Sequence, residues 1–219
     1  MHRIHYRFGY VLGLIVAAIF VTMAAPHGDG GRFVAVVLQG AVLVAAVIAS
    51  KAHPWVIRLS IVAALTGIAG SAAALFGTGQ FGDGSAGIVA LLYVILPAPA
   101  IAIGVVKQFR EEGAVTIHSM FGVLCLYLLI GLTFAVGYAV IQDVSGTDFF
   151  TIERAGRDDF LYFSYATLTT VGYGDLVAAT NLGRSLAITE ALLGQIYLVT
   201  VVALIVGNLR GRAGVETER

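Results

Sequence analysis

Six long apolar segments dominate this sequence and impose the strongest constraint on its fold. Each contains at least 18 residues, and a helix of that length covers about 27 Å, close to the thickness of the hydrocarbon layer of a membrane. Four of the six contain no Asp, Glu, Lys or Arg. The sequence therefore predicts an all-α membrane protein with six transmembrane helices, at Phe8–Ala25, Phe33–Ser50, Trp55–Phe76, Ala86–Val106, Ile117–Ile141 and Leu182–Gly207.

The composition excludes several other classes of protein. Hydrophobic residues make up 58% of the chain and charged residues 12%, whereas a soluble domain is about 25% charged. Such a chain has too little polar surface for a soluble fold and too many apolar residues for disorder. The formal net charge is zero, so no nucleic-acid partner is expected. One cysteine, Cys125, rules out an intrachain disulfide, and no constellation of residues typical of an enzyme is visible.

The positions of Lys and Arg predict the orientation, because these residues favour the cytoplasmic side of a membrane. With the amino terminus inside, nine basic residues are cytoplasmic and four lie outside. Both termini of this multi-pass protein are then cytoplasmic, and membrane lipids surround it. Eleven Arg against two Lys indicate a bacterial source, and hence the bacterial inner (plasma) membrane.

The first apolar segment has an alternative interpretation as a cleaved signal peptide. Met1–Arg7 is basic, and Thr22–Ala25 offers small residues for a cleavage site. The apolar run is at the long end for such a peptide, so a retained helix is favoured. Cleavage would leave the orientation of the remaining segments unchanged.

The one long connection, Gln142–Asn181, is where a functional element is expected. Its stretch Asp158–Thr169 predicts a helix of about 18 Å, too short to span a membrane and suited to a re-entrant element. Asp158 and Asp159 lie at the start of this helix, where negative charge is favourable. A glycine-rich string follows directly: Thr169, Thr170, Val171, Gly172, Tyr173, Gly174 and Asp175.

This string resembles the pore module of the potassium channel family, whose selectivity filter reads Thr-Val-Gly-Tyr-Gly. The resemblance covers roughly Ile117–Asn208 and implies a homotetramer around a K⁺ pathway. It implies a pore domain at 111–219 that follows a four-helix transmembrane domain at 1–110. Within the pore domain we expect an outer helix at 117–141, a pore helix at 158–169, the filter at 170–174 and an inner helix at 182–207.

The physical requirements of K⁺ conduction match these residues. An ion that enters a narrow pore sheds water, and rings of backbone carbonyls from four chains replace it. The expected K⁺ ligands are the carbonyls of Thr170, Val171, Gly172 and Tyr173, with the Thr170 hydroxyl. Gly172 and Gly174 supply backbone conformations closed to most residues. K⁺ is the permeant ion, and no cofactor is expected.

Residues around the filter are expected to support it. Thr169 and Asp175 flank the string, and the resemblance implies a hydrogen bond between Tyr162 and Asp175. The alternative for Tyr162 is aromatic packing at the membrane interface. Many family members carry an acidic residue where this chain has Ala166, so the strut behind the filter in those channels is absent here.

The inner helix carries the candidate cavity and gating residues. Gly194 matches the hinge glycine of the family, although small residues also serve helix contacts. Helical periodicity places Gln195, Leu198, Val202 and Val206 toward a central cavity. Glu190 is expected to face the pore helix or a neighbouring subunit. It is either a functional ionisable group or a neutral acid hydrogen-bonded to a hydroxyl such as that of Ser164 or Thr167.

The fourth segment argues against a voltage sensor. Voltage-gated family members place several arginines there, but Ala86–Val106 contains none and includes Pro97 and Pro99. The sequence therefore predicts a K⁺ channel without steep voltage gating. Two alternatives stay open, namely a non-conducting membrane scaffold or sensor with a vestigial pore module, and a subunit of a K⁺ uptake transporter.

Overall fold

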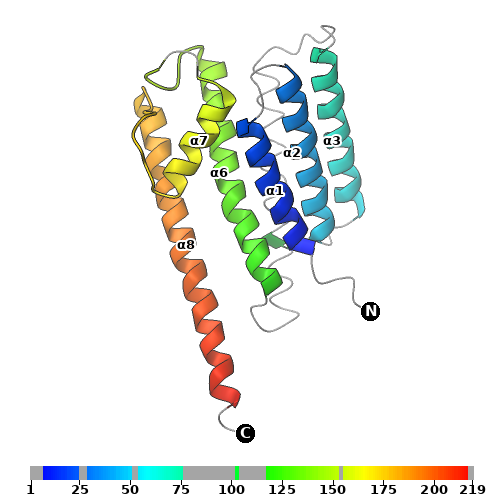
Figure 1. Cartoon of the computed structure of the whole chain (residues 1–219), viewed down its shortest axis with the longest axis vertical. Helices are drawn as coiled ribbons and strands as arrows, with labels where there is room; N and C mark the ends of the chain where they lie inside the picture. Colours follow the sequence, from blue (N-terminus) through cyan, green and yellow to red (C-terminus); the bar gives the residue numbers. More distant parts are fainter. Residues whose placement is uncertain are drawn as a thin grey trace.

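The computed structural model describes residues 7–24, 29–50, 54–75, 102–103, 117–152 and 155–216, and these residues form a bundle of helices. Figure 1 shows the arrangement. The helices with stated bounds are α1 (Arg7–Ala24), α2 (Asp29–Ala49), α3 (Pro54–Leu75), α6 (Ile117–Ser145), α7 (Arg157–Leu168) and α8 (Asn181–Glu216).

Five of the six predicted apolar segments coincide with helices, namely α1, α2, α3, α6 and α8. The other segment, Ala86–Val106, lies outside the described residues except for 102–103. Within the described ranges, one helix is long and apolar enough to cross a membrane, at Met120–Ser145 in α6. Shorter apolar helices occur at Phe8–Ala24, Val36–Ala49 and Pro54–Ala69. The all-helical character is confirmed for the described residues, and the number of six spans stays a prediction.

The helix ends differ from the predicted bounds for a physical reason. The outer helix, expected at 117–141, continues to Ser145, and the inner helix, expected at 182–207, begins at Asn181 and continues to Glu216. Hydropathy detects only the apolar part of a helix. The backbone hydrogen bonds of the helix continue through polar residues, so the observed helices are longer than the predicted segments. α6 ends where Gly146 adopts a φ of +63° and its N–H donates to the Gln142 carbonyl at 3.0 Å.

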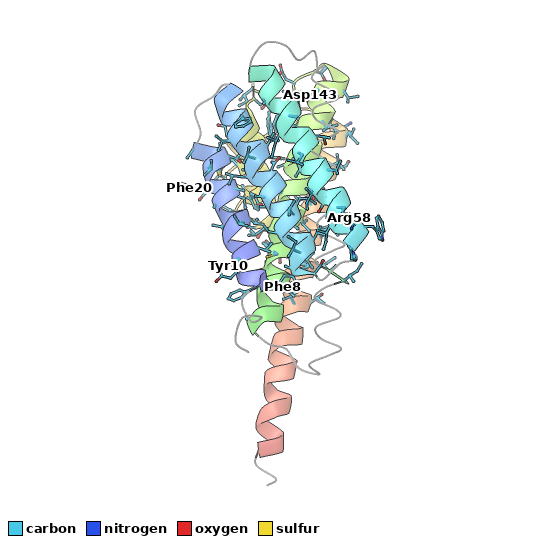
Figure 2. The ribbon with its side chains drawn as sticks, turned by 90° about the vertical axis from the view of Figure 1, so that its right-hand side faces the viewer. Phe8, Tyr10, Phe20, Arg58 and Asp143 are labelled. Atoms are coloured by element: carbon cyan, nitrogen blue, oxygen red, sulfur yellow. The ribbon has the colours of Figure 1, made fainter. Side chains whose placement is uncertain are left out.

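α1 packs directly against α6 and α7. One core cluster joins residues of α1, α2, α6 and α7, among them Ile15, Ala46, Leu129 and Leu161. α3 packs on α2 through a second cluster of Leu43, Val47 and Ala64. In Figure 2, Phe20 and Tyr10 project outward from α1, and both side chains are exposed. Large exposed apolar side chains on this face suit a lipid environment.

α7 is the short helix predicted between the last two apolar segments. It starts at the same end of the bundle as α8, and the loop that follows it returns to that end (Figure 1). The helix spans Arg157–Leu168, one residue earlier at each end than expected. Asp159 fixes its start, since its carboxylate accepts a hydrogen bond of 2.8 Å from the N–H of Gly156.

The chain before α7 is tied to the chain after the filter. Phe150 and Ala178 form an antiparallel bridge, with hydrogen bonds from Thr151 N–H to the Val177 carbonyl and from Ala179 N–H to the Phe149 carbonyl. The rings of Phe149 and Phe150 pack in a buried cluster with Tyr138, Phe160 and Ala178. These contacts fix the chain after the 170–174 strand against α6 and α7.

Candidate functional site

The backbone of residues 170–174 alternates in handedness. Thr170, Gly172 and Gly174 have φ values of +59°, +52° and +81°, while Val171 and Tyr173 lie outside the positive-φ region. Alternating left- and right-handed residues turn successive N–H groups to one side, which leaves successive carbonyls for the opposite side. A row of carbonyl oxygens along one face of the strand is the arrangement that a desolvated cation needs.

Thr170 is the unusual member of this strand, because β-branched residues rarely adopt positive φ. Such a conformation costs about 1–3 kcal/mol and persists only where its surroundings enforce it. The Thr170 N–H donates to the Thr167 carbonyl at 3.0 Å, and the Gln195 amide donates to Thr170 Oγ1 at 3.1 Å. Two hydrogen bonds from different elements therefore hold the inner end of the strand.

Hydrogen bonds also attach the rest of the strand to the carboxyl end of α7. The Gly172 N–H donates to the Ala166 carbonyl at 3.0 Å, and the Thr169 hydroxyl donates to the Tyr165 carbonyl at 2.6 Å. The side chains of Val171 and Tyr173 are 52% and 74% exposed within one chain. The strand thus has a rigid support on one side and an uncovered side that a single chain does not fill.

Tyr162 anchors the carboxyl end of the 170–174 strand. Its hydroxyl donates to Asp175 Oδ2 at 2.9 Å, which is the hydrogen bond that the resemblance implied. Its ring also stacks on Tyr173, with 6.3 Å between ring centroids and 4° between planes. The implied hydrogen bond of Tyr162 is therefore confirmed, and its ring also packs within the protein.

Two tyrosine contacts between α6 and α7 were not predicted from the sequence. The Tyr127 hydroxyl donates to the Leu168 carbonyl at 3.1 Å, and the Tyr165 hydroxyl donates to the Leu128 carbonyl at 2.7 Å. Gly131 makes this packing possible, because a Cβ there would lie 2.6 Å from Cε1 of Tyr165. The signal in the sequence was a glycine one turn after a tyrosine on an otherwise apolar helix.

Gly194 brings the inner helix against the end of the pore helix. A Cβ at this position would lie 2.5 Å from the Leu168 carbonyl oxygen. α8 runs without interruption through Gly194, so this conformation contains close packing rather than a break at the expected hinge. Gln195, the next residue, is exposed and reaches Thr170, while Leu198 is half-buried. Val202 and Val206 lie on α8, but their side chains are outside the described part of the structure.

Glu190 lies where α6, α7 and α8 meet, and its side chain is fully buried. Glu190 Oε1 lies 2.5 Å from Ser164 Oγ, and the Tyr138 hydroxyl donates to Oε2 at 2.7 Å. The expected contact with Ser164 is present. The contact with Tyr138 was not predicted, since nothing in the sequence set the rotation of α6 relative to α8.

No cluster of three or more His, Cys, Asp or Glu that could hold a metal ion occurs within the described ranges. The candidate cation ligands are the backbone oxygens of the 170–174 strand, where φ is positive at Thr170, Gly172 and Gly174. They suit a weakly held alkali ion better than a tightly bound divalent metal, because backbone carbonyls are neutral dipoles.

Known proteins match part of the chain. A family model described as "Ion channel" matches residues 124–210. "Probable potassium channel protein 2" of Methanocaldococcus jannaschii is 34% identical over 84 residues, which cover 36% of this chain and 22% of that protein. "Two pore potassium channel a" of Oryza sativa subsp. japonica is 40% identical over 87 residues, or 39% of this chain and 22% of that protein.

A shorter relative is matched over most of its length. "Protein LctB" of Bacillus caldotenax is 38% identical over 95 residues, which cover 40% of this chain and 69% of that protein. By contrast, the chain spans about a fifth of the two larger relatives. No solved structure matches the chain. The family-model match, at residues 124–210, includes the 170–174 string.

Proposed function

We propose that this chain, which belongs to the potassium channel family, is a subunit of a homotetrameric channel that conducts K⁺ selectively and passively across the membrane. The observation that carries the proposal is the alternating backbone of the filter, with positive φ at Thr170, Gly172 and Gly174. A complete filter string in this conformation, supported by hydrogen bonds to a short, partly buried helix, favours conduction over a vestigial module.

The mechanism follows from the geometry of one strand. Four strands around an axis would present rings of carbonyl oxygens that replace the water of K⁺. The Thr170 hydroxyl would add a ring at the inner end, and its contact with Gln195 would fix the orientation of that hydroxyl. Conduction needs no covalent chemistry, because each ring binds the ion weakly enough to pass it to the next.

The apolar surface of the pore domain supports assembly into a tetramer. Large apolar side chains of α8 are exposed in one chain, among them Ile188, Leu192, Ile196 and Val199. They lie on the same helix that contacts the filter through Gln195, and Val171 and Tyr173 extend the exposed surface. Irregular backbone is tolerated at membrane depth only when protein or water surrounds it. Three further copies of the chain, related by a closed rotation, would supply that cover.

The orientation is proposed from the basic residues and the fold together. Figure 2 places Phe8 of α1 toward the end of the bundle opposite Asp143 of α6. With the amino terminus inside, Asp143 and the start of α7 face the outside. The outer end of the filter, at Asp175, is then extracellular or periplasmic, and the carboxyl end of α8 is cytoplasmic. Cysteine labelling from each side of inverted vesicles tests this orientation.

Purified protein in liposomes is expected to pass K⁺ faster than Na⁺ by about tenfold or more, because the carbonyl rings suit the larger, less strongly hydrated ion. The measurement is the rate of a K⁺- or Na⁺-driven flux, with protein-free liposomes as the control. Equal rates for the two ions would contradict the proposed selectivity. No flux above the control, from protein shown to be tetrameric by mass, would favour the scaffold alternative.

Steep voltage dependence is not expected. Such gating takes several charges per subunit, each worth about 2.3 kcal/mol per 100 mV across the membrane. Ala86–Val106 carries no basic residue, and Arg58 lies near the start of α3 with an exposed side chain. Currents recorded in symmetrical K⁺ across about ±100 mV test this prediction. A tenfold rise in open probability over a few tens of millivolts, without a blocker, would contradict it.

A further inference from the structure

The contacts of Glu190 fix the positions of three protons. Three oxygen pairs are close: Glu190 Oε1 to Ser164 Oγ at 2.5 Å, Ser164 Oγ to the Gly131 carbonyl at 2.6 Å, and Tyr138 Oη to Glu190 Oε2 at 2.7 Å. Glu190 and Ser164 are fully buried, and Tyr138 is 1% exposed. Each of these pairs needs a hydrogen between its oxygens, because two bare acceptors at such distances repel each other.

An ionised Glu190 leaves this network one hydrogen short. Ser164 and Tyr138 each carry one hydroxyl hydrogen, and the Gly131 carbonyl carries none. A carboxylate would also only accept, so two hydrogens would have to serve three oxygen pairs. A neutral Glu190 supplies the third hydrogen. Its O–H then donates to Ser164, Ser164 donates to Gly131, and Tyr138 donates to the remaining oxygen of Glu190.

We propose that Glu190 is a neutral carboxylic acid that positions the pore helix between the outer and inner helices. Its role in conduction rests on the proposed channel function, whereas its protonation state does not. The network links α8 to α7 through Ser164 and to α6 through Tyr138. The network supports the same helix on which Ala166, two residues after Ser164, lacks the acidic side chain that many family members use to support the filter.

Any displacement of α7 would directly displace the filter strand. Ser164 lies one turn before Leu168, whose carbonyl accepts from Tyr127. The Ala166 carbonyl accepts from the Gly172 N–H. A shift of α7 would therefore move the carbonyls that hold the filter strand. Glu190 is a positioning residue in this sense, because it acts on the ion pathway through the pore helix.

Alkaline pH is expected to break the network. The titratable groups that face Glu190 from the packed helices are the phenols of Tyr127 and Tyr138 on α6 and of Tyr165 on α7. None of them carries a positive charge that would stabilise a carboxylate. Without the Glu190 proton, the single hydrogen of Ser164 could serve either Glu190 or the Gly131 carbonyl, and the other oxygen pair would have none. The carboxylate charge would also lie in a buried site without water.

The first test measures protonation directly and needs no ion flux. Infrared spectra of the purified protein at neutral pH are expected to contain the carbonyl band of a buried neutral carboxylic acid, and Glu190→Gln is expected to lack that band. Raising the pH should convert the band to that of a carboxylate. A wild-type spectrum that does not differ from that of Glu190→Gln in this band would overturn the proposal, whatever the protein conducts.

The second test separates positioning from simple packing. Gln has one amide donor for Ser164 and one carbonyl for Tyr138, so Glu190→Gln should keep K⁺ flux within about twofold of wild type and should remove its decline at alkaline pH. Glu190→Met fills a similar volume without hydrogen bonds, and should lower selective flux about tenfold or more because buried partners lose their bonds. Equal damage by the Gln and Met variants, or an unchanged pH profile in the Gln variant, would overturn the positioning role.

A matched pair on the pore helix completes the test. Ser164→Ala removes the hydroxyl that contacts Glu190, and Thr167→Ala removes a half-buried hydroxyl on the same helix. Ser164→Ala should reproduce the loss of flux seen in Glu190→Met, and Thr167→Ala should conduct like wild type. If Thr167→Ala is as damaging as Ser164→Ala, the effect belongs to the helix surface in general and the proposal fails.

Discussion

Gly172→Ala is expected to abolish selective K⁺ conduction. The Gly172 φ is +52°, and an L-residue in this region costs about 1–2 kcal/mol more than glycine. A Cβ at this position would meet no atom within 4 Å in the chain, so backbone strain is the whole of its effect within one subunit. In a tetramer each of the four subunits would contribute this strain to the same carbonyl ring, for a total of about 4–8 kcal/mol. The strand should relax by losing its alternation, which turns carbonyls away from the ion.

Gly146→Ala is the matched control for this change. Gly146 has a φ of +63° and also has no atom within 4 Å of a built Cβ, but it lies just after α6 and outside the filter. Both variants should lose a similar amount of stability per chain. The K⁺-to-Na⁺ flux ratio in liposomes should collapse for Gly172→Ala and remain near wild type for Gly146→Ala. A selective Gly172→Ala channel would show that the alternating backbone does not carry selectivity.

The local features of the pore region were predictable because short stretches of sequence determine them. The Thr-Val-Gly-Tyr-Gly string predicted the strand, and the short Asp158–Thr169 stretch before it predicted a short helix. The bounds of that helix differ from the prediction by one residue at each end. Asp159 explains the start, since its hydrogen bond to the Gly156 N–H caps a helix whose first residue is Arg157.

The contacts behind the filter were less predictable, because they depend on how the helices rotate and approach one another. Helical periodicity directed Glu190 toward the pore helix, and Ser164 was among the expected partners. It gave no reason to select Tyr138, which belongs to another helix 52 positions earlier. The contacts of Tyr127 with Leu168 and of α1 with α6 and α7 likewise arise from tertiary packing between distant segments.

Gly194 on α8 and Gly131 on α6 also depend on tertiary packing that the sequence does not determine. The sequence left Gly194 open between a hinge and a close contact, because both need a missing side chain. Only the approach of the Leu168 carbonyl distinguishes the two in this conformation. No role was predicted for Gly131, because glycine is common on membrane helices. In the structure it accommodates the ring of Tyr165.

Gly194→Ala is expected to disrupt the pore although alanine is the better helix former. Alanine gains about 1 kcal/mol over glycine inside a helix. Against this gain, the new Cβ would lie 2.5 Å from the Leu168 carbonyl oxygen and 2.8 Å from its Cδ1. A backbone carbonyl on the pore helix cannot rotate away as a side chain does. Overpacking of this kind typically costs about 1–3 kcal/mol, and here it would also push α8 away from the pore helix.

The consequence should appear in both flux and assembly. If α8 moves outward, Gln195 loses its contact with Thr170, and the inner end of the filter loses one of the two bonds that hold its unusual φ. Selective K⁺ flux should therefore fall about tenfold or more, and the tetramer should melt at a lower temperature in detergent. Gly137→Ala, on α6 with no atom within 4 Å of a built Cβ, should instead leave flux unchanged and raise stability slightly. If Gly194→Ala behaves like Gly137→Ala, α8 does not depend on close contact with the pore helix.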